Sequence, residues 1–175
     1  MILLAGAWRL LISSGHITLG NFTPIGAMAL FGGCYFAEKW KAYLIPILAL
    51  WLSDLFLSYF VYYHQLVFFY DGFLINYGSF ILMVMMGTFI KKVNVKNVII
   101  VSISAALAHW IITDFGVWMD GRLYPMTAQG LITCYVVAIP YLKNMLISNF
   151  VFGGIMFGVF ELAQKKDPQL QLINS

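Results

Sequence analysis

The chain has 175 residues, of which 62% are hydrophobic and 10% are charged. A water-soluble domain carries about 25% charged residues, so this composition excludes a soluble globular domain and predicts an integral membrane protein with one domain over residues 1–175. The net charge of +3 is small. Because the lysines lie in short segments between apolar blocks, the charge indicates membrane topology and no nucleic-acid partner.

Apolar blocks follow one another along the chain: Ile2–Ser13, Pro24–Phe36, Tyr43–Tyr63, Gly72–Ile90, Val98–Val117, Ala128–Pro140 and Met145–Leu162. The third, fourth, fifth and seventh are about as long as a bilayer-spanning helix requires, roughly 20 residues. Ala128–Pro140 follows Pro125, ends at a proline and rises only about 20 Å as a helix. We therefore predict an all-α protein with about six transmembrane helices, in which Ala128–Pro140 is a re-entrant or half-buried segment before the last helix.

The positions of the lysines test the predicted number of transmembrane helices. They follow the second, fourth and last blocks, as Lys39 and Lys41, then Lys91, Lys92 and Lys96, then Lys165 and Lys166. If Ala128–Pro140 does not cross, all three clusters lie on one side of the membrane. The positive-inside rule then places that side, and both termini, in the cytoplasm, so the chain is predicted to be a multi-pass protein of the bacterial inner membrane. If the segment crosses, the C-terminal pair lies outside.

Ionisable residues inside apolar blocks indicate function, because each costs at least about 2.5–3.5 kcal/mol at the centre of a membrane helix. Arg9, Asp54 and His109 lie at similar predicted depths within their blocks. The simplest arrangement is an Arg9–Asp54 ion pair with His109 as a third member. Such a trio would form the polar floor of a substrate cavity or would fix helix packing, and the sequence leaves both roles open.

Polar and aromatic side chains gather in the segments predicted to lie outside. Asp114 lies near the outer end of its block, where it could bind a ligand amide or amine, or could anchor a loop. We predict that the mouth of the substrate site is formed by Asp114 together with Asn21, Trp118, Arg122, Tyr124 and Tyr135. The alternative for the aromatic members is an ordinary interfacial belt.

Small residues form two patches along the chain. One contains Gly26, Ala27, Ala29, Gly32 and Gly33, and the other contains Gly153, Gly154 and Gly158. Small faces let helices approach closely in lipid, so these patches either pack within the chain or dock a partner subunit.

Known catalytic and cofactor motifs are absent. The sequence has no GxSxG, HExxH or Walker motif, and its two cysteines match no zinc or disulfide spacing. We therefore predict no catalytic residue, metal or cofactor. Two other classes stay open: an accessory subunit of a larger membrane complex, and a membrane enzyme that acts on a lipid or isoprenoid with Asp54 or His109 as acid or base.

The segment Asn21–Gly33, NFTPIGAMALFGG, resembles the opening signature of an uncharacterised bacterial integral membrane family, defined only as a domain of unknown function. Later pieces fit the same family and extend the resemblance over nearly the whole chain: Leu52–Asp54, Thr113–Trp118, Tyr124–Pro125, Gly130–Tyr135 and Ile139–Pro140.

That family in turn resembles the substrate-binding (S) components of energy-coupling-factor (ECF) vitamin transporters. The resemblance implies six helices with both termini inside and a cavity, open to the outside, that binds a vitamin or similar micronutrient. It also implies an energising membrane subunit that docks on a small-residue face, here Gly26, Ala27, Ala29 and Gly33.

Overall fold

The computed structural model describes residues 7–9 and 19–166. Within these ranges the chain forms helices and no strand, as the composition predicted. Residues 7–9 are helical, and the rest of the predicted first block, Ile2–Ser13, lies outside the described residues. The other elements are α2 (Ile25–Tyr35), α3 (Lys39–Leu57), the π-helix η1 (Ser58–Tyr62), α4 (Phe73–Thr88), α5 (Val95–Met119) and α6 (Ala128–Lys166).

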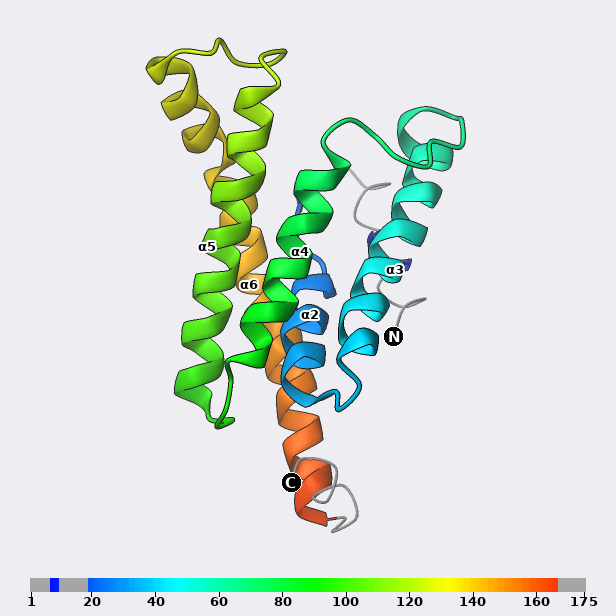
Figure 1. Cartoon of the computed structure of the whole chain (residues 1–175), viewed down its shortest axis with the longest axis vertical. Coiled ribbons are helices and arrows are strands. Elements are labelled where there is room, and N and C mark those ends of the chain that lie inside the picture. Colours follow the sequence, from blue (N-terminus) through cyan, green and yellow to red (C-terminus); the bar gives the residue numbers. More distant parts are fainter. Residues whose placement is uncertain (1–6, 10–18, 167–175) are drawn as a thin grey trace.

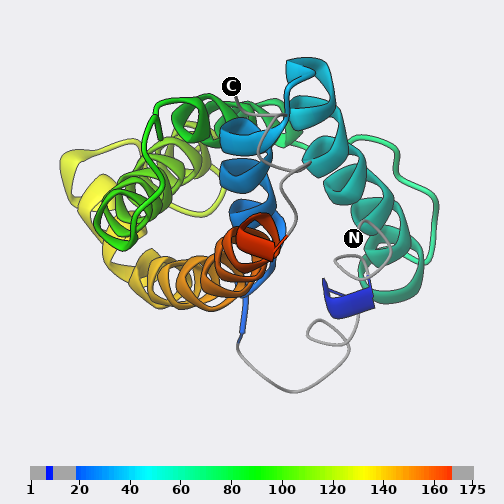
Figure 2. The ribbon, with the colours of Figure 1, turned by 90° about the horizontal axis from the view of Figure 1, so that it is seen from below.

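The helices α2 and α4 lie at the centre, with α3 on one side and the pair of α5 and α6 on the other (Figure 1). The closest pairings are α2 with α4 and α5 with α6, and α2 also contacts α3 and α6. Seen along the helices, α2 is surrounded by its neighbours (Figure 2). The short helix α2 is therefore the hub of the fold.

Three helical segments are long and apolar enough to cross a membrane: Lys39–Tyr62, Val95–Met119 and Ala128–Lys166. The helices α2 and α4 are apolar but shorter. The side chains of α5 are distributed as a lipid solvent requires. Its buried residues are small or polar, namely Ser102, Ala105, Ala106 and His109, whereas Ile99, Ile103, Ile111 and Phe115 are exposed. Small residues at helix contacts and large apolar ones toward lipid are typical of membrane bundles.

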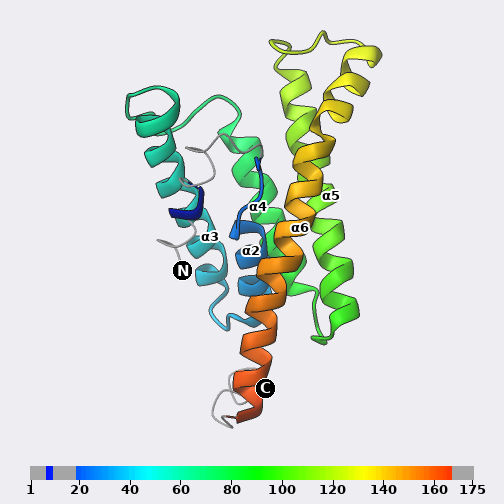
Figure 3. The same ribbon diagram turned by 180° about the vertical axis from the view of Figure 1, so that it is seen from behind.

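The predicted break before the last helix is wrong. Residues Ala128–Pro140 form the first third of one continuous helix, α6, which has 39 residues and contains Pro140 in its interior. At 1.5 Å per residue α6 is about 58 Å long, well beyond the roughly 30 Å hydrocarbon core. Its first turns lean away from the axis of the remainder (Figures 1 and 3). An interior proline removes one helical hydrogen bond and bends a helix without ending it when neighbouring groups compensate.

The three lysine clusters meet at one end of the molecule. The α2–α3 connection, the α4–α5 connection and the end of α6 all lie there (Figure 1). The α3–α4 and α5–α6 connections lie at the other end. We call these the lysine end and the opposite end. Because α6 does not turn back at Pro140, its final lysines share an end with the other clusters, as the topology predicted; which end faces the cytoplasm stays a prediction.

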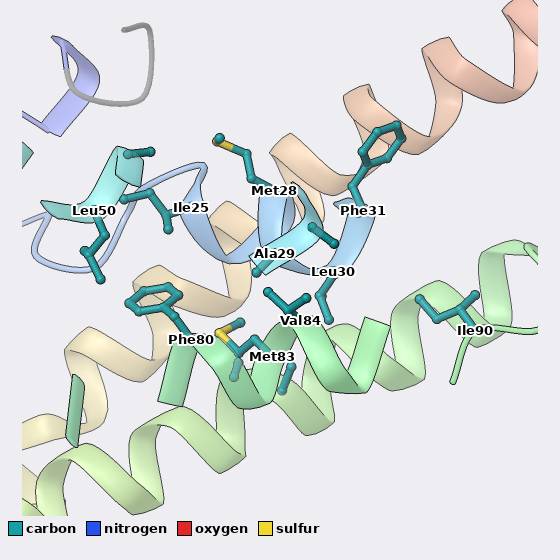
Figure 4. Close-up of a cluster of buried hydrophobic side chains, with 14 of the residues drawn as sticks. Ile25, Met28, Ala29, Leu30, Phe31, Leu50, Phe80, Met83, Val84 and Ile90 are labelled. Atoms are coloured by element: carbon teal, nitrogen blue, oxygen red, sulfur yellow. The ribbon is translucent and has the colours of Figure 1, made fainter. Parts of the chain in front are cut away.

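The small residues of α2 serve close packing inside the chain. Gly26, Ala27, Ala29 and Gly33 are all buried. A Cβ atom on Gly33 would lie 2.1 Å from the Val84 carbonyl oxygen of α4, and Met83 and Val84 point toward Ala29 and Leu30 of α2 (Figure 4). These positions therefore offer no surface to a coupling subunit in this structure, and a docking partner would have to bind elsewhere.

Candidate functional site

A cavity of about 740 Å³ lies at the opposite end, between α4, α5 and the segments that precede α2, α4 and α6. Its volume falls in the range of small-molecule sites, about 300–1,000 Å³. Its wall is formed by Asn21, Tyr70, Asp71, Gly72, Ile75, Asn76, His109, Thr113, Asp114, Gly116, Val117, Met119, Asp120, Arg122, Leu123 and Tyr141.

The helix α5 contributes the longest run of wall residues. His109, Thr113, Gly116 and Asp120 are spaced by three or four residues and therefore share one helix face. His109 lies deepest, with 4% of its surface exposed, and its ring contacts Phe80 at 4.9 Å between centroids. The register of one helix thus sets the order of polar groups from the floor to the rim.

A hydrogen-bond chain fixes the tautomer of His109. The Ser79 hydroxyl donates to the Asn76 carbonyl oxygen at 2.6 Å and lies 2.6 Å from His109 Nδ1. A hydroxyl has one proton and a carbonyl can only accept, so Nδ1–H donates to the Ser79 oxygen. His109 Nε2 is then unprotonated and has no partner among the described residues. His109 therefore brings a hydrogen-bond acceptor to the cavity.

Asp114 is the second acceptor. It is half-buried in the cavity wall, and its carboxylate makes no hydrogen bond or ion pair to any residue that the structure describes. Only its backbone is engaged, since the Asp114 carbonyl accepts from Cys134 Sγ at 3.3 Å. An unpaired carboxylate in such a position is unfavourable unless a ligand completes it.

Tyr70 and Asn76 form the wall on the α4 side. Asn76 Nδ2 donates to the Tyr70 hydroxyl oxygen at 2.5 Å. Burial, with the nearby Asp54 charge as a second cause, raises the pKa of Tyr70 to about 12. The phenol is therefore protonated at neutral pH and presents a neutral aromatic surface with an O–H donor.

The rim carries an ion cluster in which Arg122 bridges two loops. Its guanidinium lies 2.6 Å from Asp71 Oδ2 and 3.3 Å from Asp120 Oδ2. The hydrogen bond to Asp71 is the main cause that raises the pKa of Arg122. The wall contains three carboxylates and one guanidinium, and the guanidinium is already engaged at the rim. The charge of Asp114 therefore has no counterion in the cavity.

Arg9 and Asp54 form the predicted ion pair, but His109 does not join it. Arg9 Nη1 lies 2.7 Å from Asp54 Oδ1 and also donates to the Ser53 hydroxyl. The Tyr77 hydroxyl donates to Asp54 Oδ2 at 2.9 Å. Both carboxylate oxygens are thus occupied, and none of these groups is in the cavity wall. The predicted polar floor consists of His109 alone, because His109 faces α4 and Ser79.

The predicted mouth is only partly assembled. Asn21, Asp114 and Arg122 line the cavity, whereas Trp118, Tyr124 and Tyr135 do not. Trp118 Nε1 donates to the Pro125 carbonyl at 3.1 Å, and the Tyr135 hydroxyl donates to the Ile111 carbonyl at 2.9 Å. These two bonds brace α5 against the segment that follows it and against α6.

The sequence prediction missed Tyr70, Asp71, Asn76, Thr113 and Tyr141 as wall residues. Asn76 carried a usable signal, since an amide inside the apolar block Gly72–Ile90 needs a partner in lipid. Formal charge does not mark this position in the sequence, because an amide is neutral.

Among the described residues, the cavity wall contains no serine, and Ser79 lies behind its histidine. The described residues contain no group of three or more His, Cys, Asp or Glu side chains placed to hold a metal ion. Ser79 approaches His109, but it is 1% exposed and is not part of the cavity wall. Its hydroxyl orients the imidazole and is not presented to a substrate.

Comparison with known proteins assigns the chain to a family without assigning an activity. Neither a curated protein nor a solved structure matches the chain. The family described as "Family of unknown function (DUF6580)" matches residues 1–170. This agrees with the resemblance to an uncharacterised family that the NFTPIGAMALFGG segment carries. The chain therefore belongs to DUF6580, a family whose function is unknown.

Proposed function

We propose that the protein is a multi-pass protein of the bacterial cytoplasmic membrane that captures a small molecule at its opposite end for uptake, as S components do. The observation that carries the proposal is a cavity of about 740 Å³ that holds two unpaired acceptors, Asp114 and His109 Nε2. Buried polar groups in proteins are almost always paired, so a ligand that donates hydrogen bonds is the natural partner of both.

The chemistry of the wall defines the ligand class. Two acceptors and an uncompensated negative charge favour a molecule with amine or amide N–H donors. Tyr70 and Tyr141 add aromatic surface that suits a planar or cationic body. A nitrogen-containing vitamin or a similar micronutrient meets these requirements.

Uptake accounts for the cavity better than a purely structural role does. An accessory subunit would be expected to have a closed polar interior, and the Arg9–Asp54–Tyr77 cluster has that form. The Asp114 cavity is not closed in this way, because the Asp114 carboxylate is unpaired among the described residues. The outward direction of this cavity follows from the positive-inside rule applied to the lysine end, and a coupling subunit would bind outside the buried face of α2.

Asp114→Asn is the variant that tests this site. We expect the purified protein to bind at least one member of a panel of B-vitamins, corrinoids and nucleobase derivatives at micromolar concentration. Asp114→Asn keeps the shape but removes the charge, and a hydrogen bond to a charged group contributes about 1.5–3 kcal/mol. The dissociation constant should therefore rise roughly 10- to 150-fold, as measured by isothermal titration calorimetry or equilibrium dialysis.

Glu38→Gln is the matched control, since Glu38 is an exposed carboxylate at the lysine end that pairs with Lys41. It should leave the dissociation constant unchanged. Absence of binding by the folded protein across the whole panel, or an equal effect of both substitutions, would contradict the proposal.

A further inference from the structure

A second cavity, of about 470 Å³, lies between α5 and α6, which run side by side (Figure 3), and it reaches the α4–α5 connection at the lysine end. One face of each helix forms its wall, because the wall residues are spaced by three or four. They include Val95, Val98 and Ser102 on α5 and Phe150, Gly154 and Gly158 on α6. The cavity is therefore a groove that follows the two helices, and we call it the α5–α6 groove.

The α6 side of this groove carries few side-chain atoms. A Cβ atom added to Gly153, Gly154 or Gly158 would meet no atom within 4 Å. A Cβ atom on Gly33 or Gly87, between α2 and α4, would instead lie 2.1 or 2.4 Å from a backbone carbonyl oxygen. The glycines of α2 and α4 thus serve close packing, whereas those of α6 leave an open hollow among the described residues.

The length and polarity of the groove match a single acyl chain. From Phe150 to Glu161 the α6 wall rises about 17 Å, which is about half of the roughly 30 Å hydrocarbon core and so corresponds to one leaflet. Most of the wall residues between these two positions and on α5 are apolar or glycine. A hydrocarbon chain that enters from the membrane surface at the lysine end would lie along this wall.

Two lysines flank the groove where it reaches the lysine end. Lys92 precedes Val93 and Lys96 follows Val95, and both valines are wall residues. Both lysines are exposed, and neither makes an ion pair with a residue that the structure describes. Asn97 Nδ2 donates to the Lys92 carbonyl oxygen at 2.8 Å, which ties the connection to the first turn of α5. An anionic group at this end of the groove would therefore meet two cations that lack a counterion.

Glu161 is the acidic side chain among the described wall residues, and it does not neutralise these lysines. Its Oε1 accepts a hydrogen bond from the Tyr35 hydroxyl of α2. Tyr35 is buried in the bundle, so the carboxylate is held toward α2. Glu161 forms no ion pair with Lys92 or Lys96.

We propose that the α5–α6 groove binds one anionic glycerophospholipid of the leaflet at the lysine end, with an acyl chain over Gly154 and Gly158 and the phosphate beside Lys92 and Lys96. Basic pockets between transmembrane helices bind anionic head groups in this way. The phosphate provides the selectivity, because an acyl chain gains no hydrophobic free energy when it moves from lipid into the groove. The site does not depend on the ligand of the Asp114 cavity.

A second copy of the chain fits the groove less well than a lipid does. Two copies in one membrane have the same orientation, so a copy packed against α5 and α6 would bring its lysine end to that of the first. The unpaired lysines of the two copies would then repel each other. A lipid phosphate instead supplies the missing negative charge.

Lipid titration of the detergent-purified protein, followed by native mass spectrometry, tests the head-group half of the site. The probes are phosphatidylglycerol and phosphatidylcholine with identical acyl chains. We expect phosphatidylglycerol to bind about 30 times more tightly, because each lysine near the membrane surface contributes roughly fivefold in affinity for an anionic lipid. Lys92→Gln/Lys96→Gln should abolish this preference. Lys143→Gln, which removes an exposed lysine of α6 outside the wall, should keep it.

Gly154→Leu tests the acyl-chain half, because its side chain fills the groove. The affinity for phosphatidylglycerol should fall by roughly tenfold or more. Gly78→Leu is the matched control, since Gly78 is exposed on α4, lies outside the wall and would also meet nothing within 4 Å of an added Cβ atom. It should leave the affinity unchanged. If Gly154→Leu does not fold, the lysine double variant decides, because both lysines are exposed.

Equal affinity for the two lipids, or an equal effect of Gly154→Leu and Gly78→Leu, would overturn the proposal. A dimer of the lipid-free protein that Gly154→Leu dissociates would also overturn it, because a second copy would then occupy the groove. Inorganic phosphate should not displace the lipid, and displacement would show that the lysines bind a free anion without the acyl chain. Loss of ligand binding at Asp114 leaves each of these lipid results unchanged, so the two sites are tested separately.

Discussion

Arg9→Ala is expected to lower the free energy of unfolding by about 3–5 kcal/mol, because it leaves the Asp54 carboxylate buried without its counterion. The Asp54 side chain is 9% exposed and that of Arg9 is 17% exposed. The remaining hydrogen bond from Tyr77 cannot balance the charge. Equilibrium unfolding in mixed micelles, followed by tryptophan fluorescence, measures the loss.

The double variant Arg9→Met/Asp54→Leu removes both charges, whereas Arg9→Ala leaves the buried Asp54 charge without a counterion. Comparing the two variants shows which of these changes lowers the free energy of unfolding. Replacing both members by apolar residues of similar volume should recover most of the stability, as it does for buried ion pairs elsewhere. Glu38→Gln is the matched control, since it breaks an exposed pair with Lys41, and it should leave the unfolding transition unchanged. An Arg9→Ala protein as stable as Glu38→Gln would show that the pair does not hold the fold.

Gly87→Ala is expected to destabilise the protein by about 1–3 kcal/mol or more, as overpacking of a tight contact does. A Cβ atom at this position would lie 2.4 Å from the Leu30 carbonyl oxygen of α2. Because the obstacle is backbone, no side-chain rotation relieves it, and α2 and α4 must move apart. Gly33 makes the reciprocal approach to α4, so Gly33→Ala should have a comparable effect.

Gly78→Ala provides the control within α4. A Cβ atom on Gly78 would meet nothing within 4 Å, and alanine is favoured over glycine in a helix interior by about 1 kcal/mol. This variant should therefore be as stable as the parent or more stable in the same unfolding assay. If Gly87→Ala and Gly78→Ala unfold alike, the close contact between α2 and α4 is wrong.

The helical architecture could be predicted from composition and the spacing of apolar blocks, because a lipid solvent permits few other backbones. The continuous course of α6 could not be predicted in this way. Pro140 predicts a helix end in water, but in a bundle the neighbouring groups can satisfy the freed carbonyl, and the helix continues through it.

The sequence predicted the depth of the polar residues of the candidate site but not the direction of their side chains. That direction depends on the rotation of each helix about its own axis. Depth along a helix follows from counting residues, so Arg9 and Asp54 were correctly paired. The direction in which His109 points depends on how α5 rotates against α4, and that rotation is set by packing around Ser79 and Phe80. Asn76 was missed for a different reason: an amide has no formal charge to mark it in an apolar block, although it also needs hydrogen-bond partners in lipid.

Tertiary packing also decides whether the small-residue face of α2 is buried in the bundle or exposed to a partner. The Gly and Ala residues between Gly26 and Gly33 are compatible with internal contacts and with a docking surface. Only the position of α2 at the centre of the bundle distinguishes these alternatives, and it favours internal packing.

An experimental density map of the protein with the tightest-binding member of the ligand panel would show whether Asp114 and His109 bind the ligand. We predict ligand density in the Asp114 cavity, with a donor nitrogen about 2.7–3.2 Å from an Asp114 carboxylate oxygen and a second donor directed at His109 Nε2. A ligand bound away from this cavity, or an Asp114 carboxylate already paired with Arg122 across a closed cavity, would contradict it.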